Sequence, residues 1–286
     1  MSHDTNIMDL SELKRSWKEN DFYPKKKLGQ NFLIDKNIRD KIIEALKVTS
    51  KTVIIEVGSG FGVMTLPLAD ICRKIIAVEK DSKIYEIMRT KLSNLPNVEF
   101  VRKDIMDLDI CSAIPSGRKG LIFGNIPYYI SSPLIEKIIN AKDYLEEAFI
   151  VIQKELADRI VAGPGTKDYS SLSCYVQFYT KPAKLFKIKA NSFFPKPGVE
   201  SALLKLTILG EPSVKVKNAV LMFDIIHKAF SQRRKKIENA LSKNFDSCDI
   251  DWKEAISSCN IDPFSRAENL SLEAYARLCD KAGDML

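Results

Sequence analysis

The chain has 286 residues, of which 45% are hydrophobic and 28% are charged; it is long enough for one large domain with a small one, and too apolar to be disordered. Its six cysteines include no Cys-x-x-Cys pair, and its only histidines are His3 and His227, which argues against a metal site, a disulfide framework or a nucleophilic triad that uses histidine. No apolar run is long enough to span a membrane and the N-terminal segment lacks the apolar core of a secretory signal, so we expect a cytoplasmic protein.

The net charge of +7 is unevenly distributed along the chain. Residues 246–286 contain nine acidic and four basic residues, a balance of −5, which leaves about +12 for the remainder. A basic body favours a polyanionic partner. A lysine-rich composition with solvated charged faces would explain the same charge, so charge alone leaves both interpretations open.

Strands and helices are expected to alternate through the first half of the chain. The first 20 or so residues resemble a loose amphipathic helix or an arm, and we assign no role to residues 1–26. Asp35 is a suitable N-cap for a helix that extends to about Lys47. Five strands are predicted near residues 53–57, 75–78, 97–102, 121–123 and 148–152, with helices near 63–70, 82–92 and from Ser131 onward. This order predicts a parallel, doubly wound α/β sheet.

The second half of the chain changes character. A break at Gly163-Pro164-Gly165 precedes a short helix near residues 171–178. Two later strands, near 184–188 and 202–208, would close the sheet as an antiparallel edge, and Gly210-Glu211-Pro212 marks a linker. Beyond it the pattern is helical. We therefore expect an N-terminal arm of residues 1–26, an α/β domain of residues 27–210 and an all-helical domain of residues 211–286.

A glycine-rich segment, Glu56-Val57-Gly58-Ser59-Gly60-Phe61-Gly62, directly follows the first strand of the predicted sheet. Glycines there allow a tight turn and a close approach of the backbone to a ligand. Glu79 ends the next strand, where its carboxylate can accept hydrogen bonds from ribose hydroxyls. A nicotinamide fingerprint would need glycine in place of Val63, so the spacing fits an S-adenosylmethionine (SAM) loop better. A purely structural glycine-rich turn is the alternative.

Two later strands also end in polar residues. Asp104 follows the third strand, where it could accept from an adenine amino group, although a lone Asp after a strand is usually a turn or cap residue. Asn125-Ile126-Pro127-Tyr128-Tyr129 follows the fourth. Ligand clefts of open α/β sheets lie at such strand ends, and this segment offers acceptors beside a flat aromatic surface. It suits a flat base with an exocyclic amine; aromatic residues that plug the core are the alternative.

Methylation of such an amine makes particular demands on the site. The amine is a weak nucleophile because its lone pair is delocalised into the ring. Acceptors for both N–H protons would localise that lone pair, and the Asn125 side-chain oxygen and a backbone carbonyl near Pro127 could supply them while Tyr128 stacks on the base. No strong general base is required, because the ammonium product is acidic. We therefore expect positioning and electrostatics to supply the rate.

From about Lys27 to the C-terminus, the ordered motifs resemble the ribosomal RNA adenine N6,N6-dimethyltransferase family, in its bacterial type that acts on small-subunit (16S) rRNA. Besides the glycine loop, Glu79, Asp104 and the Asn125 motif, the resemblance rests on Gln30-Asn31-Phe32-Leu33-Ile34-Asp35, Gln153-Lys154-Glu155-Leu156-Ala157-Asp158-Arg159, Phe193-Phe194-Pro195-Lys196-Pro197 and Phe230-Ser231-Gln232-Arg233-Arg234-Lys235-Lys236. Departures are mild: Met64 stands where Leu is usual, and Gly198 where Lys is common.

The resemblance implies a Rossmann-like SAM-dependent methyltransferase sheet with a small helical C-terminal domain. The cofactor residues that it implies are Asn31, Leu33, Gly58, Gly60, Glu79, Asp104 and Asn125. The implied catalytic set is Asn125, Pro127, Tyr128 and Phe193, with Phe193 opposite Tyr128 across a flipped adenine. The implied RNA-binding residues are Arg233, Arg234, Lys235 and Lys236, on a helix whose solvated face is the alternative, together with Lys154 and Arg159, which could instead pair with Glu155 and Asp158.

The implied function is SAM-dependent dimethylation of two adjacent adenines in a hairpin near the 3′ end of 16S rRNA, within a nearly assembled small (30S) subunit. The family also implies a monomer that needs neither a metal nor a membrane and acts in ribosome biogenesis. Three alternatives remain open: a macrolide-resistance type enzyme acting on 23S rRNA, a DNA adenine methyltransferase, and a largely non-catalytic subunit assembly factor. DNA enzymes typically have Pro where this chain has Ile126. The Arg233-Arg234-Lys235 motif and the Phe193 loop favour the small-subunit substrate.

Overall fold

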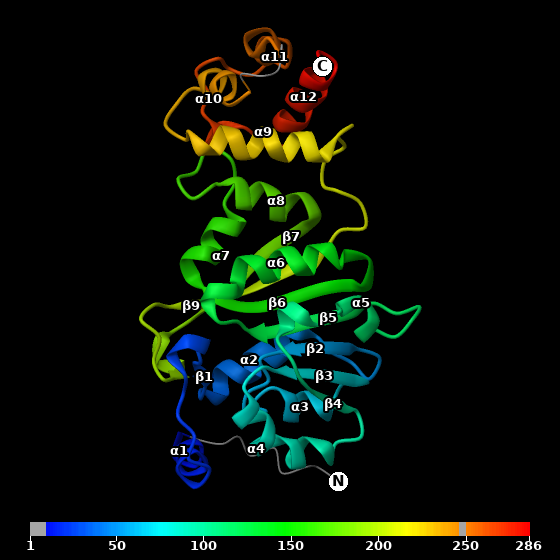
Figure 1. Ribbon diagram of the computed structural model, residues 1–286, viewed down its shortest axis with the longest axis vertical. Coiled ribbons are helices and arrows are strands. Elements are labelled where there is room, and N and C mark those ends of the chain that lie inside the picture. Colours follow the sequence, from blue (N-terminus) through cyan, green and yellow to red (C-terminus); the bar gives the residue numbers. More distant parts are fainter. Residues whose placement is uncertain (1–9, 246–249) are drawn as a thin grey trace. The chain divides into compact units, whose positions relative to one another are not determined.

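The computed structural model describes residues 10–245 and 250–286 (Figure 1). The chain divides into two compact units. Unit 1 contains the described residues up to Ala157 and residues 183–208, and unit 2 contains residues 158–182 and the described residues from Leu209 onward. One break between the units falls at residues 208 and 209, near the expected domain boundary at residue 210, which stays a prediction. Residues 158–182, which we expected in the α/β domain, instead cluster with the C-terminal helices, because their apolar side chains join the helical core.

Unit 1 is built on the predicted sheet, with the strand order β4-β3-β2-β5-β6-β9-β7 (Figure 1). The strands of this sheet are β2 (Val53–Val57), β3 (Lys74–Glu79), β4 (Val98–Arg102), β5 (Gly120–Asn125), β6 (Leu145–Gln153), β7 (Thr180–Ile188) and β9 (Ser201–Ile208). The first five are parallel, and β9 is antiparallel to β6. All five residues of β2 are buried, as expected for a central parallel strand covered on both faces. The predicted α/β sheet is therefore confirmed.

A second, two-stranded sheet was not predicted. Strand β1 (Phe32–Leu33) pairs antiparallel with β8 (Phe193–Phe194), with Leu33 opposite Phe193. Two strands of two residues each leave no readable periodicity in the sequence, because alternation needs a longer run. The pairing joins the segment before the first long strand of the sheet to the rigid loop near Pro195.

Aspartate side chains cap some of the helices of unit 1. The helices of this unit are α1 (Leu10–Glu19), α2 (Lys36–Leu46), α3 (Thr65–Ala69), α4 (Ser82–Ser93), α5 (Ile110–Ala113), α6 (Ser131–Asn140) and the first half of α7 (Lys154–Val161). Asp35 caps α2 by accepting from the backbone N–H groups of Asn37 and Ile38, as predicted. Asp81 caps α4 in the same way. Short 3-10 turns occupy residues 26–28, 105–107, 128–130, 142–144 and 190–192.

The N-terminal segment packs more firmly than expected. Leu13 and Trp17 of α1, and Phe22 after it, are buried in the same core cluster as Phe61 and Phe193. Of the two expectations for this segment, the amphipathic helix is confirmed by α1, but the helix is not loose because its apolar stripe packs in the core of unit 1. Residues 1–9 of the expected arm lie outside the described residues.

Unit 2 is helical, as predicted. It contains the rest of α7, then α8 (Ser171–Tyr179), α9 (Ala219–Ser231), α10 (Ile237–Asn244), α11 (Trp252–Ser258) and α12 (Leu272–Gly283), with a 3-10 turn at residues 267–269. The basic run 232–236 is a turn between α9 and α10, so the prediction of a basic helix is wrong there. The apolar spacing on either side of the run is helical, but two separate helices produce it. No helix in the described parts of the chain is long and apolar enough to cross a membrane.

Candidate active site and cofactor pocket

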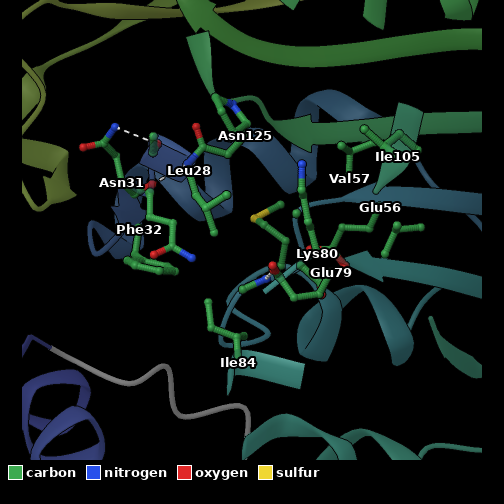
Figure 2. Close-up of a pocket in the computed structure, with 18 of the residues that line it drawn as sticks. Leu28, Asn31, Phe32, Glu56, Val57, Glu79, Lys80, Ile84, Ile105 and Asn125 are labelled. Atoms are coloured by element: carbon green, nitrogen blue, oxygen red, sulfur yellow. Dashed lines mark hydrogen bonds between the residues drawn. The ribbon is translucent and has the colours of Figure 1, made fainter. Parts of the chain in front are cut away.

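One pocket of unit 1 lies at the carboxyl ends of β2, β3 and β5 (Figure 2). Parallel pairing puts these ends at one edge of the sheet, which is where ligands bind in open α/β folds. The residues predicted from the sequence that line it are Asn31, Leu33, Gly58, Gly60, Glu79, Asp104, Asn125 and Pro127. In Figure 2, Asn31 and Leu28 lie on one side of the pocket, and Glu79 and Lys80 lie on the other.

The glycine loop owes its shape to backbone that other residues rarely adopt. Gly58 and Gly60 have φ of +70° and +54°, in the left-handed region. The backbone N–H groups of Gly58 and Ser59 both donate to the carbonyl of Val78, at 2.9 and 3.2 Å. The loop after β2 is thereby held against the end of β3, and its backbone is exposed toward the pocket.

Glu79 is fixed between the glycine loop and the start of α4. Its Oε2 accepts from the Gly60 N–H at 3.0 Å, and its Oε1 accepts from the Asp81 N–H at 2.8 Å. Burial raises the pKa of this carboxyl, although the two backbone donors act against that shift. Each carboxylate oxygen can accept more than one hydrogen bond, so both can still receive hydroxyl groups of a ligand.

Asp104 has a cationic partner that was not predicted. Lys80 Nζ lies 2.6 Å from its Oδ2, and the Met106 N–H donates to its Oδ1 at 3.0 Å. Partial burial raises the pKa of Asp104, but the Lys80 ammonium and the Met106 N–H outweigh it and lower the pKa overall. Lys80 follows Glu79 directly at the end of β3, and that position was the one signal in the sequence that could have identified it.

Asn125 has its amide oriented by the backbone of another segment. Its Nδ2 donates to the carbonyl of Asn31 at 2.7 Å, and the Asn31 side chain in turn donates to the carbonyl of Gly29 at 3.1 Å. Because the nitrogen of the Asn125 amide is used in this way, the oxygen is left to accept from another donor. This is the orientation that the predicted acceptor role requires.

The aromatic residues Tyr128, Tyr129 and Phe193 differ in whether they line the pocket. Tyr129, with 55% of its surface exposed, lines the pocket. Tyr128 is half-buried, its hydroxyl lies 3.0 Å from Ser201 Oγ, and it is not among the described pocket-lining residues. Phe193 is 3% exposed and belongs to the core cluster. The structure thus brings neither predicted ring to the pocket wall, and the stacking roles of Tyr128 and Phe193 stay predictions.

The residues present fit the chemical groups of SAM. Glu79 and Asp104 offer acceptors for hydroxyls and an amine, while Ile84 and Ile105 add apolar surface. Ser59 Oγ is buried at the pocket and has no hydrogen-bond partner among the described residues. An orphaned buried hydroxyl in a pocket is what a polar ligand group would satisfy. Among residues 10–245 and 250–286, no three His, Cys, Asp or Glu side chains gather in a way that could hold a metal ion.

Unit 2 carries a separate basic cleft. Three predicted residues, Arg159, Arg233 and Arg234, line it, and sequence reasoning missed Lys167 and Arg266. These two are isolated basic residues with no run or periodicity around them, so the sequence held no signal for them.

Arg233 itself is engaged within this cleft. Its Nε lies 2.5 Å from Glu268 Oε2, and its Nη2 donates to the carbonyl of Lys167. Arg234 and Lys235 are exposed, and Lys236 Nζ lies 4.1 Å from the centroid of the exposed Phe264 ring. Lys154 begins α7 within unit 1, apart from the residues that line the cleft. Arg233 therefore also has a structural role, because its side chain links the backbone at Lys167 to the side chain of Glu268.

The strand order, the glycine loop after β2 and the acidic residue that ends β3 define a Rossmann-like methyltransferase fold. Comparison with solved structures agrees. A crystal structure of a dimethyladenosine transferase from Plasmodium falciparum superimposes with a TM-score of 0.72 at 26% identity, covering 86% of this chain and 95% of that one. The 23S rRNA methyltransferase ErmE superimposes with a TM-score of 0.70 at 23% identity, covering 88% of this chain and 100% of that one, a likeness of fold alone.

Residues 22–283 match the family described as ribosomal RNA adenine dimethylase. The ribosomal RNA small subunit methyltransferase A of Alkaliphilus oremlandii is 40% identical over 265 residues, which are 91% of this chain and 92% of the relative. The protein of the same name from Bacillus pumilus is 37% identical over 276 residues, 93% of each chain. The chain therefore belongs to the ribosomal RNA adenine dimethylase family.

Proposed function

We propose that the protein uses SAM to dimethylate the N6 amines of two adjacent adenines in a hairpin near the 3′ end of 16S rRNA, within the small (30S) ribosomal subunit. The observation that carries the proposal is the pocket in which Asn125 lies together with the glycine loop, Glu79 and Asp104. The names of the curated relatives support the small subunit as the carrier. We further propose that the enzyme acts as a cytoplasmic monomer in small-subunit biogenesis.

Different residues of the pocket would bind different groups of SAM. When bound, SAM supplies an electrophilic methyl group. Glu79 would hold the ribose hydroxyls and Asp104 the adenine amine of the cofactor, with Asn31, Leu33 and the backbone of the glycine loop around them. Asp104 would share its carboxylate with Lys80, since the 2.6 Å contact leaves lone pairs on both oxygens. The pocket thus binds a nucleoside without a phosphate cradle.

The target adenine would contact the last residue of β5, Asn125, and the segment that follows it. Asn125 Oδ1 accepts a hydrogen bond from one N–H of the target amine, and a carbonyl near Pro127 accepts a hydrogen bond from the other, which localises the nitrogen lone pair. Tyr128 and Phe193 are proposed to stack on the extruded base, a task that requires Phe193 to leave its buried place. Extrusion is needed because a stacked base hides its amine. Rate comes from positioning and electrostatics.

The basic cleft of unit 2 would hold the rRNA backbone. Arg234, Lys235, Lys236 and Arg159 are proposed as phosphate contacts, with Arg233 partly committed to Glu268. Lys154, at the start of α7, is proposed as a further contact from unit 1. Phosphate contacts position the substrate, while the contacts of residues 125–128 with the target amine and base select what is methylated.

Methyl mapping on separated ribosomal subunits tests the substrate. Purified protein, SAM and unmethylated 30S or 50S subunits are incubated in parallel with adenine-containing DNA oligonucleotides, and N6,N6-dimethyladenosine is located in each product. We expect it in 16S rRNA of the 30S subunit. A product confined to 23S rRNA or to DNA would overturn the proposal, and full binding to 30S subunits without any methyl transfer would favour a non-catalytic assembly factor.

Asn125→Ala tests the acceptor role. Removal of one preorganised electrostatic contact typically costs on the order of 10²- to 10³-fold in turnover, so we expect methyl transfer to 30S subunits to fall by at least that factor while subunit binding changes little. Asn97→Ala is the matched control: its Nδ2 donates to the carbonyls of Ala69 and Cys72, outside the pocket. Turnover that survives in Asn125→Ala would refute the role of this amide.

A further inference from the structure

Trp17 of α1 contacts aromatic rings from three separate segments. Its ring centroid lies 5.6 Å from that of Phe32, 6.2 Å from that of Phe61 and 5.3 Å from that of Phe194, on which it stacks. Phe32 and Phe61 also pack edge to face on each other, at 5.2 Å. With Phe22, these rings form one aromatic cluster in which Trp17 is a shared neighbour.

Each of the three segments carries residues of the site. Phe32 and Phe61 line the cofactor pocket themselves. Phe32 stands between Asn31 and Leu33, and Phe61 directly follows Gly60. Phe194 follows Phe193, the residue proposed to stack on the target base. The indole ring of Trp17 does not line the pocket. It contacts Phe32 and Phe61, which line the cofactor pocket, and Phe194, which neighbours the residue proposed to stack on the target base.

Packing alone holds the Trp17 ring in place. The side chain is 8% exposed, and its indole N–H has no hydrogen-bond partner among the described residues. Neither Trp17→Phe nor Trp17→Ala would therefore lose a hydrogen bond. A phenyl ring would keep much of the contact surface of the indole, whereas a methyl group would lose most of it.

The chain that follows α1 is tied to the same site by polar contacts. Lys25 Nζ and Gln30 Nε2 both lie 3.0 Å from Asp81 Oδ2. The backbone N–H of Asp81 is the one that donates to Glu79 at 2.8 Å. Burial raises the pKa of Asp81, but the hydrogen bonds from Lys25 and Gln30 outweigh it and lower the pKa, so the carboxylate stays charged for these partners.

We infer that residues 10–30 form an N-terminal strap for the methyltransferase site, in which Trp17 is a positioning residue. Trp17 holds the 31–33 segment, the glycine loop and the Phe193 loop in one packing arrangement, and the Lys25–Asp81 contact fastens the strap beside Glu79. Trp17 and Lys25 thereby set the affinity for SAM from outside the pocket, whereas Leu28, Gly29 and Gln30 at the end of the strap line it. This inference rests on the proposed function, in which the pocket binds SAM.

Calorimetric titration of SAM into full-length variants tests the strap. We expect Trp17→Ala to weaken SAM binding at least tenfold and to raise the KM for SAM by more than it lowers kcat, with Trp17→Phe restoring most of the affinity. Leu46→Ala is the matched control, since Leu46 is a buried residue of the same unit near the amino ends of β2 and β5. Equal losses of SAM affinity in Leu46→Ala and Trp17→Ala would overturn the inference.

Two further measurements keep the test decisive if Trp17→Ala folds poorly. Lys25→Met removes the half-exposed ammonium from Asp81 and should weaken SAM binding by a few fold. The only other tryptophan is Trp252 of unit 2, so Trp252→Phe leaves Trp17 as the sole indole reporter. SAM should then change the emission of Trp17, and should leave that of Trp252 unchanged in Trp17→Phe.

The outcomes separate the two proposals. If the wild-type protein does not bind SAM, the proposed function fails. If the wild-type protein binds SAM but Trp17→Ala and Lys25→Met bind it equally well, and Trp17 emission does not respond, the strap alone is refuted.

Discussion

At the residue scale, Glu56 shows how burial and hydrogen bonding shape a single carboxyl. It lies one residue before the carboxyl end of β2, fully enclosed, and accepts from Thr65 Oγ1 at 2.6 Å. Burial raises its pKa to about 8; the Thr65 hydroxyl lowers the value somewhat, and the nearby Glu79 charge raises it. A neutral Glu56 at the base of the glycine loop avoids placing two carboxylates close together inside the pocket wall.

This carboxyl makes stability depend on pH. Its pKa is near 4.5 when unfolded and about 8 when folded, so between these values the folded state binds one more proton than the unfolded state. The free energy of unfolding should therefore fall as pH rises across that range. We expect Glu56→Gln to flatten this fall, measured as urea midpoints at pH 5, 7 and 9. Glu136→Gln, at an exposed site on α6, should leave it unchanged; a wild-type slope retained in Glu56→Gln would contradict the assignment.

At the element scale, Asp35 joins two segments that are far apart in the sequence. Its Oδ1 accepts from the first turn of α2, and its Oδ2 accepts from Ser192 Oγ at 3.0 Å. The second bond fastens the turn before β8 beside the start of α2. Because β8 carries Phe193, an ordinary helix cap also helps to fix the loop proposed to read the target base.

Two variants separate these tasks. Asp35→Ala should lose about 0.5–2 kcal/mol of unfolding free energy, the usual range for an N-cap, and Ser192→Ala should lose less because the cap stays intact. Both should lower turnover on 30S subunits relative to Asp251→Ala, which removes only the cap of α11 in unit 2. Denaturant unfolding and initial rates measure the two effects. Wild-type turnover in both Asp35→Ala and Ser192→Ala would show that this contact does not serve the loop.

At the scale of the whole molecule, the cofactor pocket and the basic cleft belong to different units, the pocket to unit 1 and the cleft to unit 2. Arg233 is paired with Glu268, one of the acidic residues of the C-terminal segment. This carboxylate therefore helps to fix the position of the Arg233 side chain in the cleft. Arg234 and Lys235, which are exposed, are the better candidates for phosphate contact.

Salt dependence distinguishes phosphate contacts from solvated charges. We expect the double variant Arg234→Ala, Lys235→Ala to weaken rRNA binding and to reduce the slope of log affinity against log salt by about one for each phosphate-binding side chain that is removed. Its control removes the same charge from exposed sites outside the cleft, as Lys243→Ala with Lys253→Ala. Fluorescence anisotropy across a salt series gives both slopes. Equal slopes for the two double variants would assign Arg234 and Lys235 to a solvated surface.

The amino-acid sequence by itself determined the order along the chain of the strands of the seven-stranded sheet, the glycine loop, the Asp35 cap and the polar residues at the ends of the strands. These features arise from contiguous residues, whose spacing and backbone preferences do not depend on distant partners. For the same reason the pocket residues Glu79, Asp104 and Asn125 could be predicted before their partners were known.

Only the tertiary structure decided how distant segments complete that site. Asn125 meets the carbonyl of Asn31 across 94 positions, and Ser192 meets Asp35 across 157. The tertiary structure likewise decided that Trp17 packs in the aromatic cluster, that Phe193 is buried in the core and that Lys80 pairs with Asp104. No local pattern encodes such pairs, because each is selected by the burial and charge of partners that come together only when the sheet has formed.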